Sequence, residues 1–196
     1  MLLLEDSLQK GVAPHNHGPS LLIKSLLTDR LVEDGVFSYW DPNLLRDQLV
    51  IYPRKGDTKL RKDCCEPKRY ERFSSQGQVV VMVDRDKLHR LVGLSFGACR
   101  VELREQFLEG CPQPDEVEFV LLEDNMETIL RAVADLLEVS DDVRERAVKQ
   151  KKLNERDALL IKLYDYGQGA LRDRLLIAVP SLGRLIDKLA ARLSMA

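Results

Sequence analysis

Three carboxylates stand where apolar segments of this sequence end. Glu5 closes the apolar run that starts at Met1, and Asp84 and Asp86 follow five consecutive apolar residues at 79–83. Alternate residues after a strand can point the same way, so Asp84 and Asp86 are able to converge on one cation while Arg85 points elsewhere. Carboxylates of this kind suit Mg²⁺ bound together with substrate phosphates, which would activate water for attack on a phosphodiester. The competing interpretation is that they are only solvated turn residues or helix caps.

Apolar runs alternate with helical patterns over the first 138 residues. Strands are expected at 2–5, 48–52, 78–84 and 117–122. Helices are expected from Pro19 to near Gly35, over a polar stretch before Gly77, as one long helix from Leu88 to Phe107, and after a cap at Asn125. Alternation of this kind predicts an α/β fold with a Rossmann-like parallel sheet of about four strands flanked by helices.

The expected sheet places the three carboxylates at one edge. Open parallel sheets form their sites at the carboxyl ends of the strands. Glu5 therefore joins Asp84 and Asp86 if the first and third strands are neighbours. Past Ser140 the pattern becomes purely helical. We therefore expect an α/β domain over residues 1–138, with a C-terminal helical tail over 139–196 packed on it.

The composition is typical of a folded protein, and the net charge gives it no overall polycationic field. Its 196 residues are 44% apolar and 32% charged, and the formal net charge is −2. Charge is nevertheless uneven, because residues 52–72 hold eight basic side chains against four acidic ones. This segment is either a set of solvated helix faces or a surface that binds a polyanion.

The remaining sequence features concern the state of the cysteines, the role of two histidines and the cellular location of the protein. The four cysteines show no CxxC spacing and are expected to be reduced and structural. His15 and His17 lack a third partner nearby, which favours a polar, flexible loop over a metal site. No apolar run approaches the length of a membrane helix, and the first residues lack the features of a signal peptide. A cytoplasmic protein without membrane contact is expected.

Two of these motifs, taken together, resemble the Toprim fold. An apolar strand leading to glutamate, Leu2-Leu-Leu-Glu5, and one leading to DxD, Val79-Val-Val-Met-Val-Asp84-Arg-Asp86, are typical of that family. More closely, the chain is similar to small stand-alone Toprim-like proteins related to the overcoming-lysogenization-defect nucleases and often encoded beside an ATPase. The turn Arg54-Lys-Gly-Asp-Thr-Lys59, the helix opening Asn125-Met-Glu127 and Pro180-Ser181 are further similarities. Asp6 stands where many Toprim domains have glycine.

The resemblance implies roles for individual residues. Glu5 would be a general acid/base or a metal ligand, Asp84 and Asp86 would hold Mg²⁺ or Mn²⁺, and Glu127 would be a further outer ligand. Lys55 and Lys59 would contact phosphate. For Glu127 and Lys59, the alternatives are a first-turn acid favoured by the helix dipole and one more solvated lysine.

Three functions are compatible with these motifs. The first is a metal-dependent nuclease or related phosphodiester-processing enzyme acting on DNA or RNA, as a phage-defence effector with an ATPase partner. The second is a non-catalytic Toprim-like module that binds nucleic acid or a protein. The third is a phosphatase of the haloacid dehalogenase class, which places its DxD after the first strand and follows it with a small hydroxyl residue. Here DxD follows the third expected strand and Lys87 comes next, which disfavours the phosphatase.

Overall fold

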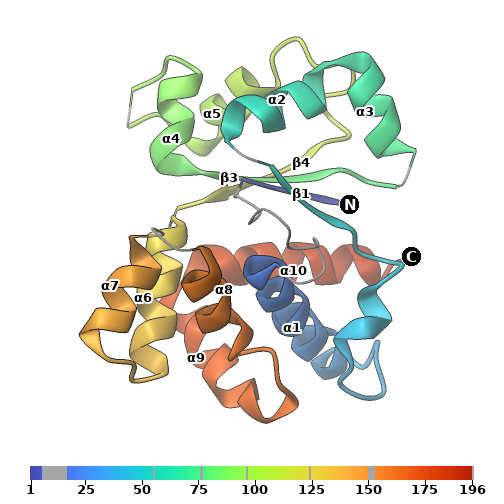
Figure 1. Ribbon diagram of the computed structural model, residues 1–196. Helices are drawn as coiled ribbons and strands as arrows, with labels where there is room; N and C mark the ends of the chain where they lie inside the picture. The colour runs from blue at the N-terminus through green and yellow to red at the C-terminus, as the bar shows by residue number, and fades with distance from the viewer. Residues whose placement is uncertain are drawn as a thin grey trace. The chain divides into compact units, whose positions relative to one another are not determined.

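The computed structural model is an α/β protein whose contacts divide the chain into two compact units (Figure 1). The structure describes residues 1–5, 17–54, 56–75, 77–95, 97–123, 125–149 and 153–195. The first unit consists of residues 1–8 and 49–125, and the second of residues 9–48 and 126–196. This is not the linear division expected at residue 138. Helix α1 (Gly18–Glu33) packs on C-terminal helices, so an early segment belongs with the tail.

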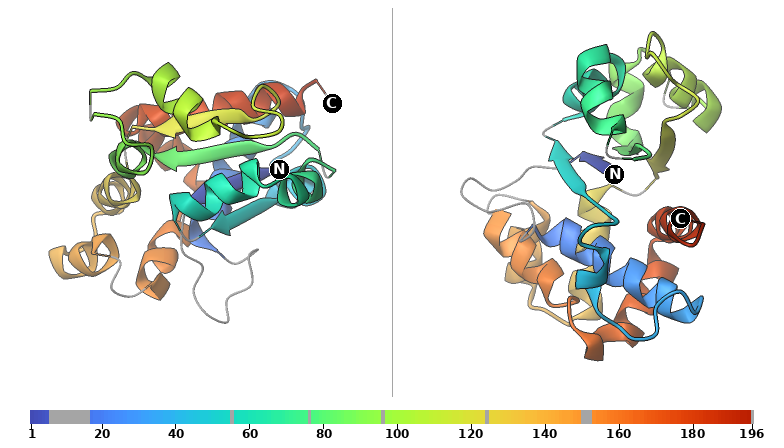
Figure 2. Two further views of the ribbon diagram at one scale, coloured as in Figure 1. Left: turned by 90° about the horizontal axis from the view of Figure 1, so that it is seen from above. Right: turned by 90° about the vertical axis from the view of Figure 1, so that its right-hand side faces the viewer.

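The first unit is built on a four-stranded sheet whose strands all run parallel (Figure 2). In chain order the strands are β1 (Leu2–Glu5), β2 (Ile51–Arg54), β3 (Val80–Asp84) and β4 (Glu118–Leu122). Their order in the sheet is β2-β1-β3-β4. The expected α/β class with a Rossmann-like parallel sheet of four strands is therefore confirmed.

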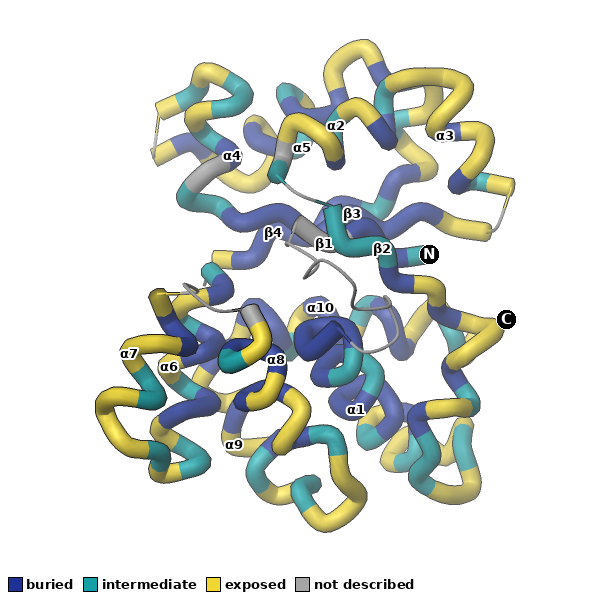
Figure 3. The backbone as a smooth tube through the Cα atoms, in the orientation of Figure 1, coloured by how far each residue is buried: buried dark blue, intermediate teal, exposed yellow. Residues whose placement is uncertain are grey.

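One face of this sheet carries the core of the first unit. Its helices are α2 (Asp57–Cys65), α3 (Pro67–Ser74), α4 (Arg85–Leu91) and α5 (Arg100–Leu108). Alternate strand residues such as Leu3, Val81 and Phe119 pack with helix residues such as Leu60 and Phe107 in one buried cluster. Figure 3 shows β3 and β4 largely buried, β2 mostly of intermediate exposure, and the outer helix surfaces exposed. Burial of both faces explains why β3 reads as an unbroken apolar run.

The prediction of one long helix from Leu88 to Phe107 is wrong, because the structure has two helices there. Helix α4 ends at Leu91, and Gly93 follows with a φ of 71°. This left-handed conformation is one that glycine adopts without a steric penalty. The amide of Leu94 then donates to the carbonyl of His89, which closes the end of the helix at 3.0 Å. The apolar spacing continued across the break, so periodicity alone did not reveal it.

The second strand was expected to stop at Pro53, but β2 continues through it to Arg54. Strand β2 lies at an edge of the sheet. The Leu2 amide donates to the Val50 carbonyl, and the alternation of a parallel ladder then turns the nitrogen of Pro53 outward. A proline is tolerated there because no ladder bond is lost. At the opposite edge, the Arg100 guanidinium donates to the Phe119 carbonyl of β4 at 3.1 Å.

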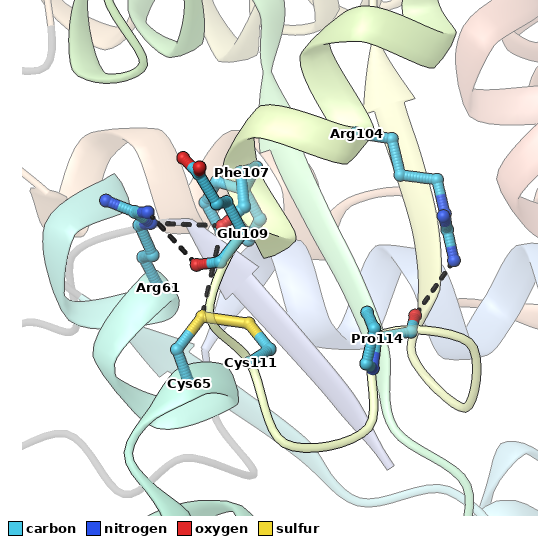
Figure 4. Close-up of a disulfide and its surroundings, with 7 residues drawn as sticks. All are labelled: Arg61, Cys65, Arg104, Phe107, Glu109, Cys111 and Pro114. Atoms are coloured by element: carbon cyan, nitrogen blue, oxygen red, sulfur yellow. Dashed lines mark hydrogen bonds between the residues drawn. A yellow bond between two sulfur atoms is a disulfide. The ribbon is translucent and has the colours of Figure 1, made fainter.

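Cys65 and Cys111 form a disulfide, so the expectation that all four cysteines are reduced is wrong (Figure 4). The bond joins the last residue of α2 to the segment between α5 and β4. Beside it, Arg61 donates to the carbonyls of Phe107 and Glu109 at 3.0 and 3.3 Å. The two half-cystines are 46 residues apart and meet only through tertiary packing, which their spacing did not reveal. A disulfide also removes the support that reduced thiols gave to a cytoplasmic location.

The second unit is helical. Besides α1 it contains α6 (Met126–Leu136), α7 (Asp141–Val148), α8 (Leu153–Ile161), α9 (Gly169–Ala178) and α10 (Pro180–Leu193), with 3₁₀ turns η2 (Pro42–Leu45) and η3 (Tyr166–Gln168). Helix α1 packs against α8 and α10. The region 139–196 is thus helical where described, as expected. His17, expected in a flexible loop, is instead buried at the start of α1, with its Nδ1 2.9 Å from the Ser20 hydroxyl.

Buried charge stabilises the second unit from within. Arg172 of α9 is 1% exposed and donates to both carboxylate oxygens of Asp29, one of them at 2.8 Å. It also donates to the Leu163 carbonyl at 2.8 Å, and its guanidinium lies 5.0 Å from the centre of the Trp40 ring. A buried arginine needs such a set of acceptors, because an unpaired buried charge is strongly destabilising.

Candidate functional site at the carboxyl edge of the sheet

Strands β1 and β3, which end in Glu5 and Asp84, are neighbours. Leu2, Leu3 and Leu4 pair in parallel with Val80, Val81 and Met82. Both strands therefore end at the same edge of the sheet, with Asp84 two residues past the pair formed by Leu4 and Met82. The expected adjacency is confirmed. The side chain of Glu5 lies outside the described part of the structure, so its role as ligand or acid/base stays a prediction.

Asp84 is a buried carboxylate at the junction of β3 and α4. Its side chain belongs to a residue only 4% exposed, level with Leu122 of β4. The residue is the N-cap of α4, with extended backbone angles of −73° and 130°. Removing a carboxylate from water is costly unless the group is paired, hydrogen-bonded or bound to a metal. Its burial therefore favours a specific role over that of a solvated turn residue.

Asp86 lies in the first turn of α4, where its carboxylate has one occupied and one open oxygen. Its Oδ2 accepts a long hydrogen bond from the Asn125 side-chain amide at 3.4 Å. Its Oδ1 is buried and has no hydrogen-bond partner among the described residues. Buried carboxylate oxygens rarely stay unpaired, so such an atom calls for a missing partner such as a water or a cation. Asn125, expected only as a helix cap, thus also contacts the DxD motif.

Arg85, between the two aspartates, is held by other groups. Its guanidinium donates to the Glu123 carboxylate at 2.5 Å and to the Ala98 carbonyl at 3.1 Å. Glu123 follows β4, so this ion pair links the ends of β3 and β4. The expectation that Arg85 points elsewhere fits these partners. Its positive charge is already matched by an acid.

The other predicted residues are placed less specifically. Lys59 is exposed on α2, and Lys55 lies outside the described residues. Glu127 is exposed in the first turn of α6, which belongs to the second unit. Within the described part of the chain, no three His, Cys, Asp or Glu side chains are grouped so as to hold a metal ion. Metal binding by Glu5, Asp84, Asp86 and Glu127 therefore stays a prediction.

A cluster of arginines near the carboxyl end of β2 was not recognised as one site from the sequence. Arg54, Arg69 and Arg72 line a cavity of about 400 Å³ together with Tyr52, Asp63 and Phe73. The charge surplus of residues 52–72 was visible, but not which of its members meet. Arg61, from the same segment, instead binds two backbone carbonyls at the end of α5 (Figure 4).

Comparison with known proteins adds no relative: no family model, curated protein or solved structure matches this chain. Among the described helices, none is both long enough and apolar enough to span a membrane.

Proposed function

We propose that this protein is a metal-dependent phosphodiester-processing enzyme, a nuclease of Toprim type acting on DNA or RNA. The observation that supports it most is the pairing of β1 with β3, which brings the chain positions of Glu5 and Asp84 to one edge of a parallel sheet. Parallel sheets place their sites at this edge. Asp86, in the first turn of α4, adds a second acid whose buried Oδ1 has no hydrogen-bond partner among the described residues.

The residues at this edge fit a hard divalent cation. Glu5, Asp84 and Asp86 would hold Mg²⁺ or Mn²⁺. When bound, the ion would polarise the phosphodiester and lower the pKa of water. Asn125 fixes one oxygen of Asp86 and leaves the other for a ligand.

Hydrolysis then requires one proton acceptor and one proton donor. An oxygen–phosphorus bond forms from water as the bond to the leaving oxygen breaks, and the proton lost by water returns to that leaving group. Glu5 is the acid/base that we assign to this transfer. Lys55 and Lys59 would contact phosphate groups of the substrate. By the same resemblance, we propose an ATPase partner and a role in phage defence.

A second candidate is a non-catalytic Toprim-like module that binds nucleic acid or a partner protein. It is favoured by the formal net charge of −2 and by Asp6, which stands where many Toprim domains have glycine. The two candidates differ in one measurable property, which is cation-dependent cleavage.

The test combines Mn²⁺ binding by calorimetry with a plasmid nicking assay. Asp84→Asn and Asp86→Asn remove one charge each, and Asp115→Asn, at a side chain 99% exposed, is the matched control. We expect both site variants to lose Mn²⁺ binding and nicking, while the control keeps both. A wild-type protein that binds Mn²⁺ but nicks nothing would favour the module. Asp84→Asn with wild-type nicking would refute the assignment of the site.

A further inference from the structure

The arginine cavity of the first unit is a built pocket rather than a chance gathering of surface charge. Its walls come from three elements, since Tyr52 and Arg54 belong to β2, Asp63 to α2, and the remaining residues to α3. A cavity of about 400 Å³ lies within the range of sites that bind small molecules.

Asp63 is the buried carboxylate that orients two of the arginines. It is 1% exposed, and its two oxygens lie 2.5 and 3.2 Å from Nε and a terminal nitrogen of Arg54. The Arg69 guanidinium lies 3.3 Å from the same carboxylate, and its Nε lies 2.6 Å from Glu66. The side chains of Arg54 and Arg69 are 31% and 46% exposed. A guanidinium has five N–H donors, so each keeps donors for a ligand.

Arg72 supplies charge that no described acid neutralises. It is exposed on α3, and the described residues include no ion-pair partner for its guanidinium. Three arginines against Asp63 leave the lining with two positive charges, or one when Glu66 is also counted. Oriented guanidinium groups with excess positive charge are typical of phosphate recognition.

The rest of the pocket is aromatic and larger than a phosphate needs. The rings of Tyr52 and Phe73 meet edge to face at 5.5 Å, and Tyr52 is partly exposed. The pocket also lies beside the candidate site, because Arg54 pairs in register with Glu5. Neighbouring strands are only ~4.8 Å apart. A ligand with both a phosphate and an attached apolar part fits such surroundings.

We propose that this arginine pocket binds one nucleotide unit of a nucleic-acid strand, with Arg54, Arg69 and Arg72 on its phosphate. The strand then passes the carboxyl edge of the sheet, where Glu5 ends β1. Delivery of a phosphodiester to that edge rests on the proposed function, whereas binding of the strand does not. The pocket thereby gives a protein of net charge −2 a local surface for a polyanion.

Binding is measured by the fluorescence anisotropy of a short labelled single-stranded DNA, with the full chain and with Ca²⁺ in place of Mg²⁺. Arg72→Ala and Arg69→Ala test the pocket, and Arg90→Ala, at an exposed arginine of α4, is the matched control. We expect about tenfold weaker binding for Arg72→Ala, since a hydrogen bond to a charged group contributes ~1.5 kcal/mol. The slope of log K against log salt should fall by about one, because one phosphate contact is lost.

Four results would overturn the proposal. The first is a wild-type protein that does not bind the strand, and the second is a set of pocket variants that bind it as well as Arg90→Ala does. The third is a protein that binds inorganic phosphate in an Arg72-dependent way but does not bind the strand. The fourth is a protein that binds polyglutamate as tightly as DNA. Pocket-dependent binding without any cleavage would leave this inference standing and refute only the proposed function. Cleavage that survives in Arg69→Ala and Arg72→Ala with unchanged binding would do the reverse.

Discussion

Reduction of the disulfide between Cys65 and Cys111 should cost the first unit much of its stability. The bond closes a loop of 46 residues, and the chain entropy that such a closure removes from the unfolded state corresponds to about 4 kcal/mol. With a urea dependence of about 2 kcal/mol per molar, the midpoint should fall by about 2 M. The assay is urea unfolding followed by circular dichroism, with and without dithiothreitol.

Two controls make this result specific. Cys99→Ser removes an exposed free thiol and should leave the midpoint unchanged. Unfolded but unreduced protein should show two reactive thiols, those of Cys64 and Cys99, out of four cysteines. Four reactive thiols, or midpoints that agree with and without reductant, would show that Cys65 and Cys111 are not joined.

Three further perturbations test the packing. Phe107→Ala, at a fully buried ring that packs at a tilt against the Phe119 ring, should lower the free energy of unfolding by about 3–5 kcal/mol in urea titrations. Burial, and then the nearby Asp63, raises the pKa of the Cys64 thiol to about 12 from 9.0, so above pH 9 the unfolded state loses this proton first. Stability should therefore fall as pH rises from 9 towards 12, by up to about 1.4 kcal/mol per unit, and Cys64→Ala should lack this part of the slope. Arg172→Ala should lower the free energy of unfolding by about 3–5 kcal/mol, because it leaves the carboxylate of Asp29 without its partner. Arg174→Ala, at an exposed arginine of the same helix, should lower it by under about 0.5 kcal/mol, and thermal melts of both variants measure the difference.

Strand β3 was predictable because burial on two faces leaves a strong signal in the sequence. Val79 to Val83 read as an unbroken apolar run, and the alternation of strands with helices favoured a parallel sheet. The break at Gly93 was harder to predict, since an isolated glycine is compatible with a helix until its φ is known.

Features that depend on distant residues were not predictable. The disulfide depends on α2 meeting the end of α5, and the arginine pocket depends on α3 folding back beside β2. Asp63 is one acid among many in the sequence, yet it is the buried group that orients Arg54 and Arg69. The position of α1 beside α8 and α10 likewise follows from contacts far apart in the chain.

The two edges of the sheet determine how this protein can recruit a partner. Pro53 offers no amide at the outer side of β2, and Arg100 occupies the Phe119 carbonyl at the outer side of β4. An extended peptide that adds to a sheet needs both kinds of backbone group in a regular row. Each edge is therefore a poor template for strand addition, which also protects the sheet from edge-to-edge aggregation and amyloid-like growth. The first unit is therefore better suited to recognition through its side chains than through strand addition.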